Sequence, residues 1–171
     1  MRVALAEGIK KDVSHGYKHV YDLLEHAVRI APEKGTYYIR EDGSEEKVTY
    51  STQKKTALGI LASLQKKGVK KGDYLIADVS DTKNYHFLMW ACFYGGIIIT
   101  ALPRPDFSVK DSETVNGTKQ IWEMLGKPVF VTDDEMKNLY ERVLGSGKTE
   151  SMQELFSEDK GNIAEISRDD A

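Results

Sequence analysis

The sequence predicts an α/β domain with a mostly parallel sheet flanked by helices. Segments of β-forming residues alternate with helical patterns from residue 51 to 144, and short connections join them. The run Ile97-Ile98-Ile99 is also typical of a strand that is buried on both faces. In an open sheet of this kind, ligands bind beyond the carboxyl ends of the strands.

The first half of the chain predicts a helix, a hairpin and a second helix. Between residues 19 and 31, Val20, Leu23, Leu24 and Ala27 have the spacing of one buried helical face. Strands at 36–40 and 47–50 flank an Asp-Gly turn. We expect Ser51 or Thr52 to cap the next helix, which ends at the glycine of position 68.

The second half continues the alternation of strands and helices. In order, it predicts a strand at 74–79, a helix at 83–94, a strand at 97–99, a helix at 111–125 and a strand at 128–132. Asp133 or Asp134 is expected to cap a further helix that Gly145 closes. The strands then end at Ser80-Asp81, Leu102-Pro103-Arg104 and Thr132-Asp133-Asp134, where a ligand would bind.

Composition limits the possible classes of protein. The chain has 171 residues, of which 40% are hydrophobic and 30% charged, with a net charge of −3. It therefore has no overall basic field for nucleic acid. One cysteine excludes an internal disulfide framework, and the longest apolar run, 87–102, is too short to span a membrane. We expect a cytoplasmic protein with a domain at 1–156 and a charged, mobile tail at 157–171.

Individual candidate sites are weak. Gly147-Lys148-Thr149 matches the end of a phosphate loop, but Arg142 replaces its first glycine and a predicted helix precedes it. A helix-terminating turn is the preferred interpretation. Three histidines with helical spacing are interpreted as exposed rather than metal-binding; they are His15, His19 and His26.

The remaining candidates also have structural interpretations. Asp133-Asp134-Glu135 could bind magnesium, but a helix cap explains these residues. The lysines at 66, 67, 70 and 71 are interpreted as a solvated turn, and Cys92 as a core residue. Arg104 could meet a carboxylate or a phosphate at the sheet edge, and a surface ion pair is preferred. We therefore assign no catalytic, cofactor-binding or metal-binding residue.

Several short strings occur in a characteristic order: Val48-Thr-Tyr-Ser51, Gly68-Val-Lys-Lys-Gly-Asp73, the stretch from Phe87 to Pro103, Gln120 to Leu125, and Val129-Phe-Val-Thr132. Taken in order, they resemble the N-terminal part of the adenylate-forming (AMP-forming) acyl-activating enzymes. This superfamily includes acyl-CoA synthetases, fatty-acyl-AMP ligases and the adenylation domains of nonribosomal peptide synthetases. Ala91-Cys-Phe-Tyr-Gly95 followed by Pro103-Arg-Pro105 resembles the fatty-acyl-AMP ligase branch. Thr52-Gln53 and Gly95 depart from the family pattern.

The resemblance implies that a longer parent enzyme joins a fatty or amino acid to a thiol by way of an acyl-AMP. ATP and Mg²⁺ would be the parent's cofactors, and CoA or a phosphopantetheinyl carrier protein its acceptor. Ser167-Arg-Asp-Asp170 resembles the approach to the family's ATP-phosphate loop, which would follow with the catalytic lysine. The chain would then be an N-terminal piece without catalytic activity, and its partner would be the rest of its own polypeptide.

Two other functions stay open on the sequence alone. The first is a complete small α/β module of flavodoxin-like shape with a binding or regulatory role. The second is a small P-loop phosphotransferase, which predicts nucleotide binding that Lys148→Ala abolishes.

Overall fold

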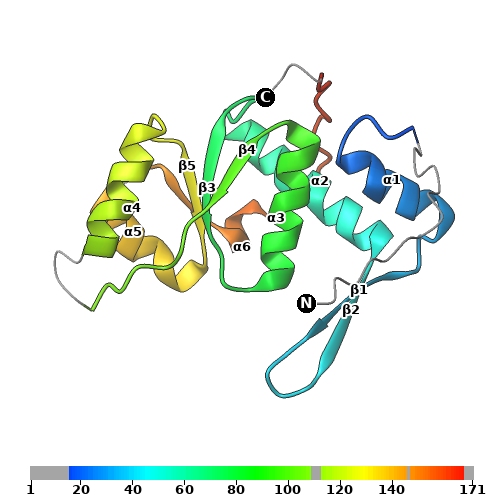
Figure 1. Ribbon diagram of the computed structural model, residues 1–171, viewed down its shortest axis with the longest axis horizontal. Coiled ribbons are helices and arrows are strands. Elements are labelled where there is room, and N and C mark those ends of the chain that lie inside the picture. Colours follow the sequence, from blue (N-terminus) through cyan, green and yellow to red (C-terminus); the bar gives the residue numbers. More distant parts are fainter. Residues whose placement is uncertain (1–15, 109–112, 146, 168–171) are drawn as a thin grey trace, which may run out of the picture.

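A parallel four-stranded sheet and a separate hairpin organise the protein, as seen in a computed structural model that describes residues 16–108, 113–145 and 147–167 (Figure 1). The helices are α1 (Tyr21–Ile30), α2 (Tyr50–Lys66), α3 (Thr82–Gly95), α4 (Glu113–Met124), η1 (Asp134–Met136, a 3₁₀ turn), α5 (Lys137–Leu144) and α6 (Met152–Leu155). The strands are β1 (Gly35–Ile39), β2 (Glu45–Thr49), β3 (Tyr74–Asp78), β4 (Ile98–Ala101), β5 (Val129–Thr132) and β6 (Thr149–Ser151). The predicted α/β class is confirmed.

The larger sheet has the strand order β4-β3-β5-β6, and all of its pairs are parallel. β3 occupies a central position, with Ile76 opposite Thr100 of β4 on one side and Phe130 of β5 on the other. After β4 the chain passes β3 and pairs on its far side, which is the reversal of strand order found in doubly wound sheets. The sequence did not predict β6.

Two hydrophobic clusters cover the two faces of this sheet. Leu75 and Ala77 of β3 pack in the first cluster with residues of α2 and α3, which pack closely against each other. Ile76 of β3 packs in the second cluster with Trp122 of α4 and Tyr140 of α5. Figure 1 shows α4 and α5 at one end of the molecule and α1 at the other. Successive side chains of a strand point to opposite faces, so the alternation along β3 produces both clusters.

The predicted apolar face of α1 is only partly correct. Leu24 is buried and Ala27 half-buried, whereas Val20 and Leu23 are about half exposed, at 53% and 51%. On the side packed against α3, the partly buried Glu25 accepts a hydrogen bond from the Tyr94 hydroxyl at 2.8 Å. A polar residue therefore lies on the packed side of the helix, because a tyrosine hydroxyl of α3 is there to pair with it.

Two other local predictions are also corrected. The cap of α2 is Thr49, whose hydroxyl accepts from the Thr52 backbone N–H at 3.1 Å, in place of Ser51 or Thr52. Ile98 is 44% exposed rather than buried on both faces. β4 is an edge strand of the sheet, so neighbours cover it less than they cover β3.

Residues 157–167, which we call the C-terminal strap, differ from the predicted mobile tail. The Gly161 N–H donates to the Leu58 carbonyl at 2.9 Å, and the Ala164 N–H donates to the Tyr94 carbonyl at 2.8 Å. The Gln65 side chain exchanges two hydrogen bonds with the Asn162 backbone, at 2.8 and 2.9 Å. The strap is thus held through its backbone, which a search for apolar anchors does not detect. Residues 168–171 lie outside the described residues.

Candidate functional site

The carboxyl ends of β3 and β5 lie side by side at the point where the strand order reverses. This is the place where doubly wound sheets bind ligands. Five side chains from three strand ends and α5 meet there, and we call them the strand-end cluster: Asp78, Ser80, Arg104, Asp133 and Tyr140. The three strand ends that the sequence predicts as a ligand site therefore meet at one edge of the sheet.

Arg104 joins the three strand ends. It follows β4 and lies between two prolines, which restrict the backbone and fix the direction of the loop. Its Nε donates to both carboxylate oxygens of Asp78, at 3.3 and 3.1 Å, and its Nη2 donates to Asp133. The predicted ion pair therefore forms with two carboxylates. Burial alone lowers the pKa of the guanidinium, but these hydrogen bonds outweigh that effect and raise it.

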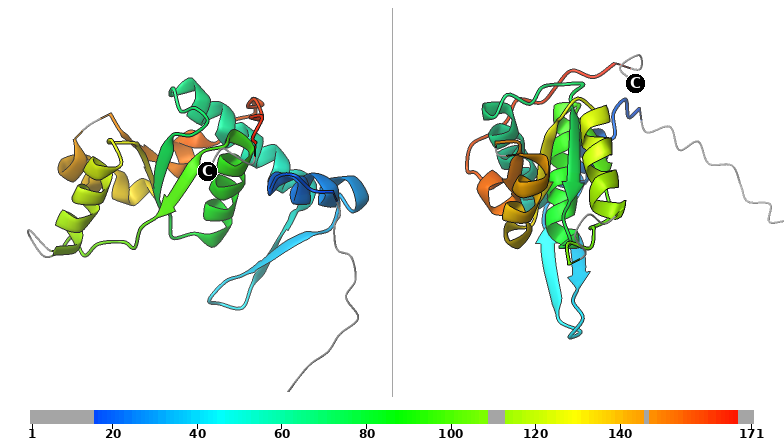
Figure 2. Two further views of the ribbon diagram at one scale, coloured as in Figure 1. Left: turned by 45° about the horizontal axis from the view of Figure 1, so that its top comes forward. Right: turned by 90° about the vertical axis from the view of Figure 1, so that its left-hand side faces the viewer.

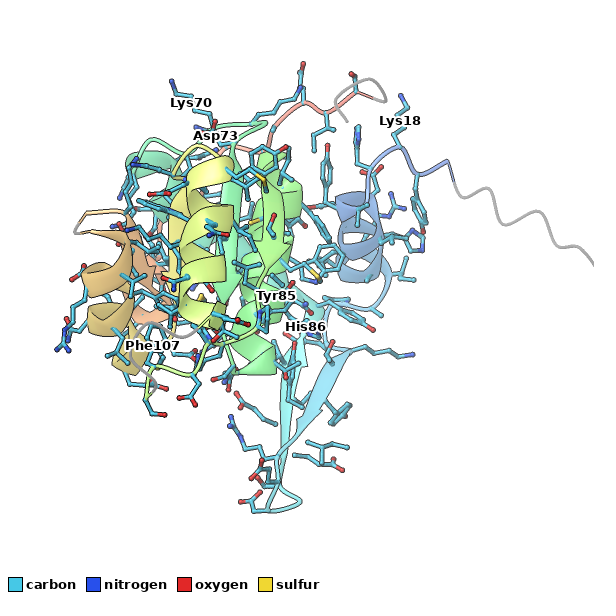
Figure 3. All side chains as sticks on the ribbon, turned by 60° about the vertical axis from the view of Figure 1, so that its left-hand side comes forward. Lys18, Lys70, Asp73, Tyr85, His86 and Phe107 are labelled. Carbon is cyan, nitrogen blue, oxygen red and sulfur yellow. The ribbon has the colours of Figure 1, made fainter. Side chains whose placement is uncertain are left out.

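Asp78 is the most enclosed carboxylate of the cluster, with a side chain 6% exposed. The Tyr140 hydroxyl donates to its Oδ2 at 2.5 Å, and the Thr132 hydroxyl donates to its backbone carbonyl at 3.0 Å. The Tyr140 ring is fully buried between Phe130, at 4.2 Å between centroids, and Phe107, at 5.0 Å. Phe107 is labelled in Figure 3. Burial, reinforced by Asp78, raises the pKa of the Tyr140 hydroxyl, so it remains a donor at neutral pH.

Asp133 does not cap the following helix, contrary to the prediction. Its side chain makes no capping hydrogen bond to η1, and its Oδ2 instead accepts from the Ser80 backbone N–H at 3.1 Å and the Ser80 hydroxyl at 2.6 Å. Burial by itself raises the pKa of this carboxyl. The hydrogen bonds from Ser80 and Arg104 outweigh burial, and the pKa lies below its ordinary value.

The lowered pKa of Asp133 predicts an acid-side loss of stability. A carboxyl whose pKa is depressed in the folded state stabilises the fold above its unfolded pKa of about 3.9, and this contribution is lost as the pH falls through the lower folded value. We therefore expect the urea midpoint of the wild type to fall below about pH 4 more steeply than that of Asp133→Asn. Identical pH profiles for the two proteins would contradict the assignment.

The strand-end cluster has the chemistry of a clamp rather than of a catalyst. Arg104 is neutralised by two carboxylates, and the Ser80 hydroxyl already donates to Asp133. The pKa values of Arg104 and Tyr140 are raised and that of Asp133 is lowered, so all three move away from the neutral range that a general acid or base needs. The arrangement fixes the loop 102–108 over the carboxyl ends of β3 and β5.

The other sequence candidates are not brought together. His19 stacks on Tyr21, and His26 Nδ1 lies 3.0 Å from the Arg29 Nη2. His15 lies outside the described residues. Across 16–108, 113–145 and 147–167, no group of three or more potential ligands could hold a metal ion.

Three of the four lysines have partners within the part of the chain that the structure describes, and the cysteine lies in the core. The lysine side-chain partners are Asp159 for Lys66, Glu150 for Lys67 and the Glu165 carbonyl for Lys71. Cys92 is fully buried, and burial raises the pKa of its thiol, as a core residue requires. No helix in the described residues is long and apolar enough to cross a membrane.

Comparison with known proteins then identifies the fold. No family model matches the sequence. Among solved structures, the chain is 25% identical to McyG A-PCP complexed with phenylalanyl-adenylate; the match has a TM-score of 0.81 and covers 98% of this chain and 31% of that one. A fatty acid AMP ligase from Legionella pneumophila is 16% identical, with a TM-score of 0.78 over 95% of this chain and 28% of its own.

The chain has the fold of the N-terminal subdomain of adenylate-forming enzymes. The o-succinylbenzoate CoA synthetase MenE from Bacillus subtilis also matches, at 21% identity and a TM-score of 0.61 over 82% of this chain and 26% of its own. The chain thus spans about a third or less of the length of these adenylate-forming proteins.

The described part of this adenylate-forming fold does not fit ATP and Mg²⁺. Asp133 is committed to Arg104 and Ser80, and Asp134 accepts from the Gln153 backbone N–H at 3.3 Å. Lys148 leads into strand β6, whereas a phosphate loop leads into a helix. No step involving ATP or Mg²⁺ is assigned to these residues.

Sequence reasoning missed two members of the strand-end cluster. The sequence predicts only that Asp78 lies in the strand at 74–79 and that Tyr140 lies in the helix that Gly145 closes. A carboxylate at the end of the apolar run Leu75-Ile-Ala77 was the available signal, because buried carboxylates require partners. The partners of Asp78 are Arg104 and Tyr140, which lie 26 and 62 residues further along the chain. The sequence therefore could not predict which residues pair with this carboxylate.

Proposed function

We propose that this chain is the N-terminal part of an ATP-dependent acid–thiol ligase. The parent would join a carboxylic acid to the α-phosphate of ATP, releasing pyrophosphate, and then pass the acyl group to a thiol. The observation that carries the proposal is the match of 98% of the chain to 31% of the McyG A-PCP chain, with a TM-score of 0.81. The short strings that occur in the family's order along the sequence support the same proposal without reference to the fold.

The substrate is proposed to be a fatty or an amino acid. The neighbours' names support this range, since they include complexes with phenylalanyl-adenylate, keto acyl adenylate and acyl adenylate. The acceptor is proposed to be CoA or a phosphopantetheinyl carrier protein. One neighbour is an adenylation domain joined to a carrier protein (A-PCP), and another is a CoA synthetase.

Within that enzyme, the strand-end cluster would have a supporting role. Arg104 ties the loop 102–108 to β3 and to the segment after β5, and Phe107 packs against Tyr140. We propose that this loop forms part of the wall of the acyl pocket. The cluster would hold the wall at a fixed distance from the sheet.

The isolated chain is expected to be inert. Lys148 leads into strand β6 rather than into a helix, and Asp133 is already paired with Arg104 and Ser80. Incubation of the 171-residue protein with ATP, Mg²⁺, hydroxylamine and a panel of fatty and amino acids should therefore yield no acyl-hydroxamate above a no-enzyme control. A longer polypeptide from the same reading frame should yield it with at least one acid.

Either half of this expectation can fail separately. ATP-dependent hydroxamate formed by the 171-residue chain alone would refute its inert role. A longer polypeptide that activates no acid would refute the ligase proposal. In that case the flavodoxin-like module gains support, since the order β4-β3-β5-β6 has the reversal typical of that shape.

A further inference from the structure

Among the residues that the structure describes, no strand pairs with the outer edge of β1. It pairs with β2 alone, in a two-stranded antiparallel sheet that projects from the body of the protein (Figure 2). The Arg40 N–H donates to the Ser44 carbonyl, and the Tyr50 N–H donates to the Lys34 carbonyl, so the even-numbered residues of this strand direct their backbone groups toward β2. Because these groups alternate along an antiparallel pair, Tyr37 and Ile39 direct theirs away from β2.

The sequence protects one edge of the hairpin and not the other. β2 reads Glu-Glu-Lys-Val-Thr, with the charges that commonly prevent an edge strand from pairing. β1 reads Gly-Thr-Tyr-Tyr-Ile, which has high strand propensity and no charge. Tyr37 and Ile39 are also exposed, at 57% and 73%.

A groove of about 420 Å³ lies between β1 and the start of α3. Six consecutive residues, 36–41, form one wall, and residues 80–83 with His86 form the other. The Tyr38 hydroxyl lies 3.1 Å from His86 Nδ1, and the Arg40 Nη1 lies 3.9 Å from the Asp81 Oδ2, so the two walls are held together. A wall made of every residue in a row, rather than of alternate ones, is what the edge of a strand provides.

Three observations indicate what kind of segment would bind in the groove beside β1. A two-stranded sheet is marginally stable by itself, and a third strand would add hydrogen bonds to it. The outward groups of Tyr37 and Ile39 are two residues apart, the spacing that an extended backbone pairs with. The charges lining the groove balance, with Arg40 and Lys83 against Glu41 and Asp81, which favours an uncharged strand.

We propose that an extended, uncharged segment of the same polypeptide occupies this groove as a third strand on β1. The inference rests on the proposed function, in which this chain is part of a longer enzyme, as its matches to proteins about three times as long support. The added strand would pair with Tyr37 and Ile39 and cover their exposed side chains.

Amide hydrogen exchange, read residue by residue by NMR, tests the proposal with internal controls. The Tyr37 and Ile39 amides should exchange at least about tenfold more slowly in a longer polypeptide from the same reading frame than in the 171-residue chain. The Tyr38 and Arg40 amides, which face β2, should change little. Ile39→Pro removes an outward donor and should reduce the protection of Tyr37 in the longer polypeptide, whereas Ile39→Ala keeps the donor and should retain it.

Each other outcome is informative. Equal exchange of Tyr37 and Ile39 in the two polypeptides would overturn the proposal. Protection that rises with the concentration of the 171-residue chain alone would overturn it in favour of a second copy. If the longer polypeptide forms acyl-hydroxamate but its Tyr37 and Ile39 amides are unprotected, the added strand is refuted and the ligase proposal stands. If these amides are protected but no acyl-hydroxamate forms, the ligase proposal is refuted and the added strand stands.

Discussion

Asp78→Ala should lower the free energy of unfolding by about 1–3 kcal/mol, the usual cost of leaving a buried hydrogen-bonding group without its partner. The substitution leaves the fully buried Tyr140 hydroxyl without its acceptor and removes one of the two carboxylates that neutralise Arg104. Urea unfolding monitored by circular dichroism measures the effect. At roughly 2–4 °C per kcal/mol for a chain of this size, the melting temperature should fall clearly.

A matched control for Asp78→Ala shows whether the loss of stability comes from the buried contacts or from the loss of a negative charge. Glu123 is an exposed carboxylate on α4, and Glu123→Ala should change stability by less than about 0.5 kcal/mol. Tyr140→Phe should also cost less in the Asp78→Ala protein than in the wild type, because the two side chains share one hydrogen bond. A loss below 1 kcal/mol for Asp78→Ala would show that the cluster is not a clamp.

Gly59→Ala should destabilise the protein and release the C-terminal strap, although alanine favours helices. Gly59 lies within α2, where a Cβ would come 2.1 Å from the Ser157 carbonyl oxygen. The helix propensity of alanine would contribute about 1 kcal/mol of stability, but overpacking against backbone typically costs about 1–3 kcal/mol. We expect a net loss of stability and faster trypsin cleavage after Lys160.

Gly117→Ala is the matched control for this prediction. Gly117 also lies within a helix, α4, and a Cβ there would meet nothing within 4 Å. This substitution should therefore stabilise the protein by about 0.5–1 kcal/mol and leave cleavage at Lys160 unchanged. Equal effects of the two substitutions would mean that the strap does not pack on α2.

Local chemistry made much of the fold predictable. The hairpin at Asp42-Gly43 follows from a turn that needs a positive φ, and Gly43 has a φ of 79°. The buried face of α2, including Ile60 and Leu64, follows from a spacing of three and four residues. In both cases the determining residues are near each other in sequence.

The errors occur where a residue has distant partners. Asp133 looked like a helix cap, because nothing nearby in sequence competes for its carboxylate. In the fold, Ser80 and Arg104 reach it from 53 and 29 residues away. The strap looked mobile because backbone hydrogen bonds to α2 and α3 leave no pattern in its side chains.

The sequence by itself determined the α/β class, the alternation of strands and helices, and the resemblance to adenylate-forming enzymes. The class and the alternation follow from hydrophobic periodicity and turn residues, which act over a few positions of the chain. The resemblance rests instead on several short strings that occur in the family's order. Only the tertiary structure decided that Arg104 is clamped between Asp78 and Asp133, and that β1 keeps an open edge beside a groove. Both depend on which strands become neighbours, and strand pairing is set by packing between segments far apart in the sequence.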